Sequence, residues 1–313
     1  MSLSPLGILV EIAEDGRFLA KDRGFLTILD HGAELGRIPL DDIAAVMATS
    51  PATSASCALL AELAERGIPF VLCGARYAPV GIVWPVSGHH AQQRRMEAQI
   101  DASRPMAKRL WALVIAAKLI RQGWALEQAG KPAGAFVRLA KMVKAGDPDN
   151  LEAQGARRYW TALMGTKFRR DTDGEGANAM LNYGYAVLRA ATARAIVAAG
   201  LHPGIGIFHR HPQNAMPLAD DLMEPFRPVV DLAVLGLLKG GETEVGTTVK
   251  RTLAGLLRQE ERTVAGRTPL ATCLNRLAAS LADSFLIGVP ALDFPWIKIA
   301  QGEADAADDP ANE

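Results

Sequence analysis

The apolar residues of this chain change their spacing once, on either side of a segment rich in glycine and proline. Before that segment, apolar runs are short and turns containing glycine interrupt them, as at Gly16, Gly24 and Gly32. After it, apolar residues recur at steps of three and four over long stretches. Short runs between turns are typical of strands, and the longer periodicity is typical of amphipathic helices. The sequence therefore predicts an α+β chain in which a small β-rich N-terminal domain precedes a larger all-α C-terminal domain.

The same change of spacing predicts the domain borders. The β-rich domain is expected over residues 1–76, a linker over 77–90 and the helical domain over 91–300. Regular structure in the linker is expected to break at Pro79, Gly81, Pro85 and Gly88. The final residues, 301–313, are acidic and polar, which predicts a disordered tail.

Single elements follow from the local patterns. In the first domain, the runs 8–10, 25–29 and 43–47 predict a meander of short strands, and 58–66 predicts a helix. In the second domain, one helical stripe consists of Leu110, Leu113, Val114, Ala117, Ile120 and Trp124. Lys118 falls off this stripe and is therefore expected on the exposed face of the helix.

A second helical stripe begins at Met180 and ends at Ala195, with Gly184 in its middle. Glycine within a helix costs about 1 kcal/mol relative to alanine, so its presence needs a reason. We expect another backbone to approach the helix closely at Gly184.

The net charge of zero hides an uneven distribution of charge. The chain holds 34 basic and 34 acidic residues, which by itself argues against a nucleic-acid partner. Residues 91–170, however, contain 16 basic and 6 acidic side chains, whereas residues 1–50 contain 4 and 8 and residues 281–313 contain 1 and 7. A local surplus of ten positive charges is enough to bind a polyanion. The alternative is a solvated helical face without a ligand.

Neither a membrane nor secretion is predicted. No apolar run approaches the roughly 18 residues that suggest a membrane span. The first six residues lack the basic start and apolar block of a signal peptide. We expect a cytoplasmic protein.

Three segments carry side chains that could bind a metal ion or take part in catalysis. Glu152 follows the N-cap residue Asn150 in a first helical turn, and five basic residues come soon after it, namely Arg157, Arg158, Lys167, Arg169 and Arg170. A glycine-rich loop, 204–212, contains His209. Asp221 and Glu224 stand three residues apart, so on a helix they project from one face and could share a cation, unless Arg227 neutralises one of them. Taken alone, each of these three signals fits a structural role better than a functional one.

Taken together, two or three carboxylates and one imidazole favour Mg²⁺ or Mn²⁺ over zinc. The chain has no nucleophile elbow, no Walker loop and no dinucleotide-binding fingerprint. Acyl transfer, nucleotide hydrolysis and hydride transfer therefore lack support.

These fragments resemble the CRISPR-associated protein one family, whose members insert new spacers into CRISPR arrays. The resemblance rests on Asn150-Leu151-Glu152, Asn178–Tyr185, the loop that reaches His209, and Leu218–Pro228. It covers nearly the whole chain, and the last segment is most similar to type II systems.

The resemblance implies a site, an activity and partners. It implies that Glu152, His209 and Glu224 are catalytic and bind the metal, with Asp221 in second rank. It implies a metal-dependent DNA endonuclease and integrase, in which a DNA 3′-hydroxyl attacks a phosphodiester at the border of a repeat. It also implies double-stranded DNA as the ligand, and a homodimer that forms a heterohexamer with a small ferredoxin-like adaptation partner.

Two alternatives from other classes stay open. A divalent-metal DNA repair nuclease would use the same site without joining strands. A non-catalytic DNA-binding scaffold would use the acidic residues and His209 for structure only, and none of its activities would depend on metal.

Overall fold

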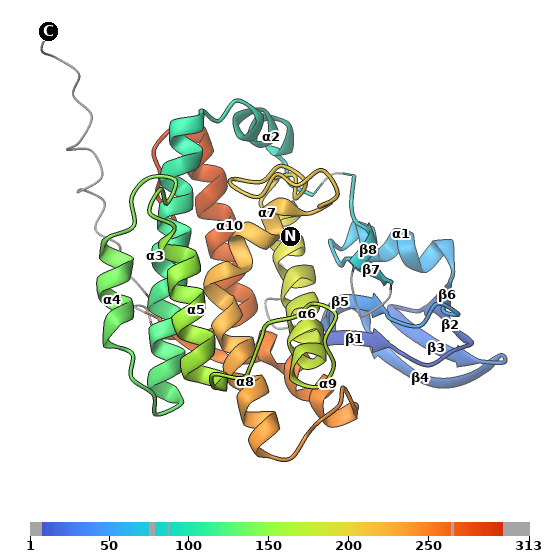
Figure 1. Cartoon of the computed structure of the whole chain (residues 1–313). Helices are drawn as coiled ribbons and strands as arrows, with labels where there is room; N and C mark the ends of the chain where they lie inside the picture. The colour runs from blue at the N-terminus through green and yellow to red at the C-terminus, as the bar shows by residue number, and fades with distance from the viewer. Residues whose placement is uncertain (1–7, 75–78, 87, 264–265, 297–313) are drawn as a thin grey trace, which may run out of the picture.

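Strands and helices occupy opposite sides of the molecule, as the sequence predicts. The computed structural model describes residues 8–74, 79–86, 88–263 and 266–296. Figure 1 shows the strands gathered beside α6 and α9, with the larger helical part on the other side. The α+β class with a β-rich N-terminal region is thereby confirmed. The tail expected at 301–313 lies outside the described residues.

The first sheet of the N-terminal region has the order β1-β5-β7-β8. Its strands are β1 (Ile8–Ile12), β5 (Ile43–Ala48), β7 (Phe70–Cys73) and β8 (Pro79–Val83). β1 and β7 both pair with β5 in parallel, and every residue of β5 is buried. A parallel strand covered on both faces reads as a continuous apolar run, as 43–47 does. Because β1 pairs with β5 and not with its neighbour in the sequence, the predicted meander is wrong for this sheet.

The second sheet is the part of the N-terminal region where the meander prediction is confirmed. Its order is β4-β3-β2-β6, and β2, β3 and β4 pair antiparallel in succession. The strands are β2 (Arg17–Asp22), β3 (Phe25–Asp30), β4 (Ala33–Pro39) and β6 (Ser54–Ala55). The predicted helix forms as α1 (Cys57–Glu65), where the Ser56 side chain accepts a hydrogen bond from the Leu59 backbone N–H.

Part of the expected linker is a strand. β8 lies within 77–90 and pairs antiparallel with β7. It is the edge strand of its sheet, and Pro79 is its first residue, which is where a sheet tolerates proline. The expectation of an irregular segment is therefore wrong for 79–83. An edge strand leaves one side of its backbone unpaired, so the N–H group that Pro79 lacks is not needed there.

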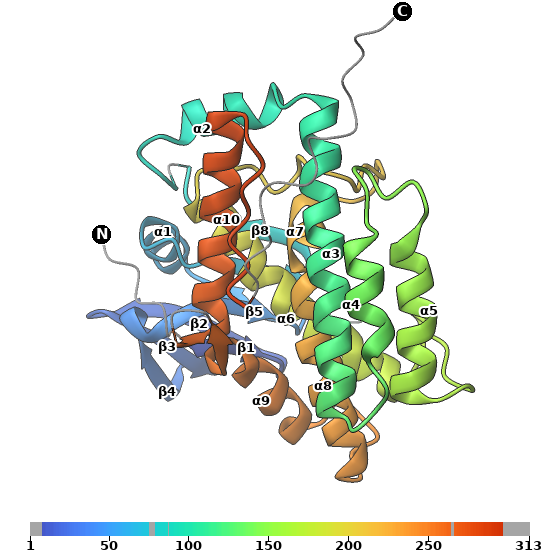
Figure 2. The ribbon, with the colours of Figure 1, turned by 90° about the vertical axis from the view of Figure 1, so that its left-hand side faces the viewer.

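The helical domain is built around two long helices. They are α3 (Arg104–Gln128) and α6 (Ala177–Ala198), and both carry many buried apolar residues. Around them lie α2 (Gln92–Ile100), α4 (Gly134–Lys141), α5 (Leu151–Met164), α7 (Pro217–Met223), α8 (Arg227–Lys239), α9 (Thr247–Gly255) and α10 (Leu270–Ile287). Figure 2 shows α3, α4 and α5 side by side at one edge of the molecule.

The helical domain departs from the predicted all-α architecture at one place. A two-stranded sheet of β9 (Glu260–Thr263) and β10 (Gly266–Pro269) precedes α10. The short length of these strands, in a segment rich in charged residues, gives no apolar alternation by which the sequence could have indicated them.

α10 is the one helix among the described residues that is long and apolar enough to cross a membrane. Its buried face includes Leu274, Leu277 and Leu281, which belong to the core of the helical domain. The helix packs against α6 and α2. Burial in a protein core therefore accounts for its apolar composition.

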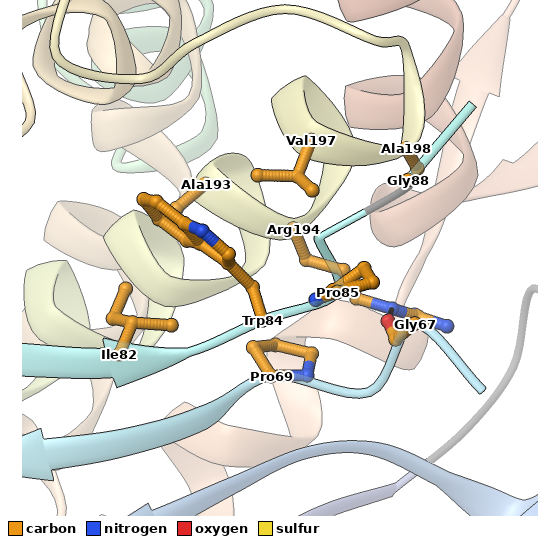
Figure 3. A pocket seen from close by; sticks show the side chains of 10 residues that line it. All are labelled: Gly67, Pro69, Ile82, Trp84, Pro85, Gly88, Ala193, Arg194, Val197 and Ala198. Carbon is orange, nitrogen blue, oxygen red and sulfur yellow. Dashed lines mark hydrogen bonds between the residues drawn. The ribbon is translucent and has the colours of Figure 1, made fainter. Parts of the chain in front are cut away.

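At the junction between the two regions lies a small, partly open cavity of about 50 Å³. Figure 3 shows the ring of Trp84 reaching from the end of β8 toward Ala193 on α6. Arg194, the next residue on α6, also lines the cavity, and the Nε of Arg194 donates a hydrogen bond to the backbone oxygen of Gly67 at 3.3 Å. Burial lowers the pKa of Arg194. None of the residues lining this cavity is among the predicted site residues.

Gly184 is a point of close packing, but against side chains and not against the expected backbone. A Cβ atom at Gly184 would lie 2.4 Å from Val230 Cγ1 on α8 and 3.5 Å from Leu253 Cδ2 on α9. Real Cβ atoms do not approach other atoms to 2.4 Å. The glycine therefore lets α8 and α9 pack closely on α6.

We predict that Gly184→Ala lowers the free energy of unfolding by about 1–3 kcal/mol, because overpacking outweighs the gain in helix propensity. Urea denaturation measures this change. In a Val230→Ala background the same substitution should be neutral or stabilising, because the clashing methyl group is gone.

Gly236 on α8 provides the control, since a Cβ atom there would have nothing within 4 Å. Gly236→Ala should raise stability by up to about 1 kcal/mol. Equal effects of the two Gly→Ala changes would contradict the packing role of Gly184.

Candidate active site

Glu152 lies in the first turn of α5, as predicted, but another residue caps that helix. Asn150 has φ of 50° and its side chain makes no capping hydrogen bond. The carboxylate of Asp147 accepts hydrogen bonds from the backbone N–H of Leu151 at 2.9 Å and of Glu152 at 3.0 Å. Asp147 therefore has the capping role that the sequence assigned to Asn150, and it fixes the start of α5.

A lysine connects the two glutamates of the predicted site. The Nζ atom of Lys118, on α3, lies 2.7 Å from Glu152 Oε1 and 2.6 Å from Glu224 Oε2. Lys118 is only 8% exposed and Glu224 only 4%. The structure thus brings Glu152 and Glu224 together from distant parts of the chain, with one ammonium group between them.

Lys118 is the site residue that the sequence reasoning missed. The expectation that it lies on the exposed face of its helix is wrong. Trp111, Lys118, Arg121 and Gln122 are all buried on α3. Lys118 is four residues after Val114 and seven after Trp111, so it shares their face of the helix. A charged residue in phase with a buried stripe is the signal that would have identified it.

Glu224 has a second cationic partner. Arg227 Nε lies 3.0 Å from Glu224 Oε1, as the sequence suggested for one of the two acidic residues. Burial alone would raise the pKa of Glu224, but Arg227 and Lys118 outweigh it and hold that pKa below its ordinary value. Burial alone would likewise lower the pKa of Lys118, yet Glu224 and Glu152 hold it above its ordinary value. Both groups are therefore charged at neutral pH.

Asp221 organises the loop that carries His209. Asp221 Oδ2 accepts hydrogen bonds from the backbone N–H of Ile207 at 2.6 Å and of Phe208 at 3.0 Å, and Oδ1 accepts one from the N–H of His209 at 3.2 Å. A Cβ atom at Gly206 would lie 2.6 Å from the backbone oxygen of His209, so a larger residue would not fit there. The loop conformation thus depends on a buried carboxylate and on one glycine.

The ring of His209 is held on two sides. Its Nδ1 atom lies 2.5 Å from Asp221 Oδ1. Trp111 on α3 contacts this ring edge to face, with 5.5 Å between the ring centroids. Trp111 also stacks on Phe208, with 4.2 Å between the ring centroids. The hydrogen bond with Asp221 raises the pKa of His209, and burial only partly opposes this effect. With Nδ1 engaged, Nε2 is the ring nitrogen left for a ligand.

Asp221 and Glu224 contact different side chains in this structure. α7 ends at Met223, and Glu224 begins a short 3-10 helix, Glu224–Phe226. Asp221 points to the loop and His209, whereas Glu224 points to Lys118 and Arg227. The two carboxylates are therefore close in sequence but have different partners and different structural roles.

An open cleft of about 400 Å³ adjoins this loop. His209, Arg210 and His211 line one side of it, and Gln99 and Ile100 at the end of α2 line another. The cleft gives His209 access to a ligand from solution, and Arg210 makes its wall basic.

The side chains fit a divalent cation once the lysine is taken into account. In the described part of the chain, no three His, Cys, Asp or Glu side chains cluster so as to hold a metal ion as they stand. Two carboxylates and one imidazole nitrogen are nevertheless the donor types that Mg²⁺ and Mn²⁺ accept. Glu152 and Glu224 already hold a cation, the Lys118 ammonium. These donor types therefore fit such an ion, and in this structure the Lys118 ammonium lies between the two carboxylates.

Four of the five predicted DNA-binding residues are exposed, and the fifth has structural partners. Arg157 and Arg158 lie on the outer face of α5, and Lys167 and Arg169 lie in the loop after it. The Arg170 guanidinium instead donates hydrogen bonds to the side chains of Asn178 at 3.1 Å and Asn182 at 2.6 Å.

Another buried carboxylate links two of the helices that carry the site. Asp231 on α8 accepts hydrogen bonds from the hydroxyl groups of Tyr159 on α5, at 2.9 Å, and of Tyr185 on α6. Burial raises the pKa of Asp231 to about 7, although these hydrogen bonds lower it. The network ties together the helices that carry Glu152 and Arg227.

Comparisons with known proteins show which family this chain is similar to. The sequence model of the family described as CRISPR associated protein Cas1 matches residues 10–265. A curated protein of Neisseria meningitidis serogroup C (strain 8013), named CRISPR-associated endonuclease Cas1, is 37% identical over 239 residues, which are 76% of this chain and 78% of that protein.

Two solved structures share the fold. A casposase bound to integration product has a TM-score of 0.77 at 20% identity, and the match covers 96% of both chains. A Cas6-RT-Cas1–Cas2 complex has a TM-score of 0.71 at 17% identity, covering 96% of this chain and 37% of that one. At these identities the likeness shows the architecture alone.

The ionisation of Asp231 predicts a pH dependence of stability. Above about pH 4 the unfolded chain has released this proton, whereas the folded protein keeps it until about pH 7. Stability should therefore fall as pH rises from 4 to 7, by up to about 4 kcal/mol relative to Asp231→Asn. Urea denaturation of both proteins across this range measures the difference.

Asp101→Asn, which removes an exposed carboxylate at the end of α2, controls for the removal of one charge. Parallel stability curves for the wild type and Asp231→Asn would refute the assignment.

Proposed function

Because this chain belongs to the CRISPR-associated Cas1 family, we propose that it is a metal-dependent DNA endonuclease and integrase that inserts short DNA fragments as spacers into a repeat array. The proposal rests on one observation: the carboxylates of Glu152 and Glu224 both contact the buried ammonium group of Lys118. A carboxylate pair of this kind, beside a histidine that lines an open cleft, is suited to phosphodiester chemistry.

Glu152, His209 and Glu224 are proposed to hold Mg²⁺ or Mn²⁺. Such an ion, when bound, polarises a phosphate and stabilises the leaving oxygen. The protein's own residues prepare the site: Arg227 keeps Glu224 ionised, and Asp221 fixes the orientation of the His209 ring. Asp221 is therefore a positioning residue and not a direct ligand.

The remaining task of the protein is to align two DNA ends. A captured fragment presents its 3′-hydroxyl to a phosphodiester at the border of a repeat, and correct alignment can contribute about 7–11 kcal/mol. Arg157, Arg158, Lys167 and Arg169 are proposed to bind the phosphate backbone of double-stranded DNA, because all four are exposed. When water replaces the hydroxyl, the same site cleaves DNA.

The proposed assembly is a homodimer that forms a heterohexamer with a small ferredoxin-like adaptation partner, in the cytoplasm and away from membranes. Support comes from the solved Cas1–Cas2 complex that shares this fold. Within the chain, β4 is an edge strand, and Leu35 on it is 57% exposed. An open strand edge with an exposed apolar residue suits a contact with another chain.

Replacement of Glu152, His209 or Glu224 by alanine should reduce both cleavage and strand joining at least about 100-fold, because each substitution removes a proposed ligand. Duplex binding should stay nearly unchanged. The assay measures how much of a labelled duplex with a free 3′-hydroxyl is joined to a supercoiled target that contains a repeat.

Glu127→Ala, an exposed carboxylate at the end of α3, is the matched control and should leave activity unchanged. Cleavage without joined products would favour a repair nuclease. Activity that is absent with and without metal in the wild type would favour a scaffold.

The basic surface predicts a salt dependence. Replacing Arg157, Arg158, Lys167 and Arg169 with glutamine should reduce the slope of log K against log salt by about 0.9 for each DNA phosphate that is no longer neutralised. Arg170 stays in place because its partners are Asn178 and Asn182. Fluorescence anisotropy titrations between low and moderate salt measure the slope.

Arg251→Gln with Arg267→Gln removes two exposed charges outside residues 91–170 and serves as the control. An unchanged slope in the fourfold variant, or an equal effect per charge in the control, would show that DNA binds elsewhere.

A further inference from the structure

Lys118 occupies the position between the two carboxylates that a metal ion would need. Its Nζ atom contacts Glu152 Oε1 at 2.7 Å and Glu224 Oε2 at 2.6 Å. Lys118 extends from α3, Glu152 from α5, and Glu224 follows α7. The ammonium group is thus the link that holds three separate elements at one point.

The charges of the site are balanced without a metal ion. The carboxylates of Glu152 and Glu224 are opposed by the ammonium of Lys118 and the guanidinium of Arg227. A divalent cation added to these four groups would leave two positive charges in excess. Glu224 and Lys118 are nearly inaccessible to water, so solvent screens such an excess poorly.

The excess can be relieved in two ways. The ammonium can leave the carboxylates, or anionic groups can enter the site. Phosphates of a DNA backbone are such groups, and they also offer the displaced ammonium a new partner. Both changes occur together if metal and DNA bind as one event.

We propose that Lys118 is a built-in competitor of the divalent cation, which holds the carboxylates together in the free protein and weakens metal binding until DNA phosphates arrive. The inference rests on the proposed function, since it takes Glu152 and Glu224 as metal ligands. By linkage, the factor by which DNA tightens metal binding equals the factor by which the metal tightens DNA binding. Lys118 thus limits metal binding by the free protein and couples it to DNA.

The test measures Mn²⁺ binding to the full chain without DNA, by isothermal titration calorimetry and by the electron paramagnetic resonance signal of free Mn²⁺. Lys118→Met should bind Mn²⁺ at least about tenfold more tightly than the wild type, because the competing charge is gone. Its thermal unfolding temperature should also rise more on addition of Mn²⁺ than that of the wild type.

Two further variants separate charge from packing. Lys118→Gln keeps a hydrogen-bond donor without the charge, so it should also bind Mn²⁺ more tightly, and it serves if Lys118→Met does not fold. Lys108→Met removes an exposed lysine from the same helix and should leave the affinity at the wild-type value.

The outcomes distinguish this inference from the proposed function. Equal Mn²⁺ affinities in the wild type, Lys118→Met and Lys118→Gln would overturn the role of Lys118 and leave the metal site in place. Tighter binding in Lys108→Met as well would also overturn it, because the effect would then be one of net charge. No Mn²⁺ binding by any variant, and no difference from Glu152→Ala, would overturn both proposals.

Discussion

The burial of charge is the constraint on which the helical domain depends. A carboxylate or an ammonium group removed from water is strongly unfavourable unless an opposite charge or several hydrogen bonds replace the solvent. Lys118 and Glu224 are both buried, and each neutralises the other. This pairing is satisfied only when α3 and the segment after α7 meet in one register. The ion pair therefore specifies the relative placement of elements that are far apart in the sequence.

Three of the buried carboxylates in this domain are stabilised by different partners. Glu224 is opposed by an ammonium and a guanidinium group, so it stays ionised. Asp221 accepts backbone hydrogen bonds and contacts His209, which shapes a loop. Asp231 accepts hydrogen bonds from two tyrosine hydroxyl groups, and burial raises its pKa to about 7. The chemistry of each carboxylate follows from its neighbours and not from its residue type.

The distribution of charge gives the molecule two electrostatic regions. Exposed arginines on α5 and the loop after it form the outer basic surface, while the paired charges lie inside. Arg170 shows that a basic residue in the same run can belong to the interior network, because its hydrogen bonds to Asn178 and Asn182 brace the start of α6. A count of basic residues thus overestimates the surface that is free to bind DNA.

Local patterns were sufficient for much of the fold. The buried strand β5, the helix α1 and the stripe of α3 follow from apolar spacing, and Glu152 falls in a first helical turn as its neighbours indicate. These features depend on residues a few positions apart, which the sequence displays directly. The pairing of β1 with β5 did not follow, since strand partners far apart in sequence are chosen by burial. The strand β8 did not follow either, because Pro79 and Gly81 predicted a break in regular structure.

The identities of Glu152, His209 and Glu224 as candidates came from the sequence through its resemblance to a family, and their arrangement came from the tertiary structure. The sequence determined which residue types are present and on which elements they stand. Only the fold decided that Lys118 lies between the two glutamates and that Asp221 turns to His209. Most of these contacts join residues that are well separated along the chain. Such contacts are set by the packing of whole helices, which no local pattern encodes.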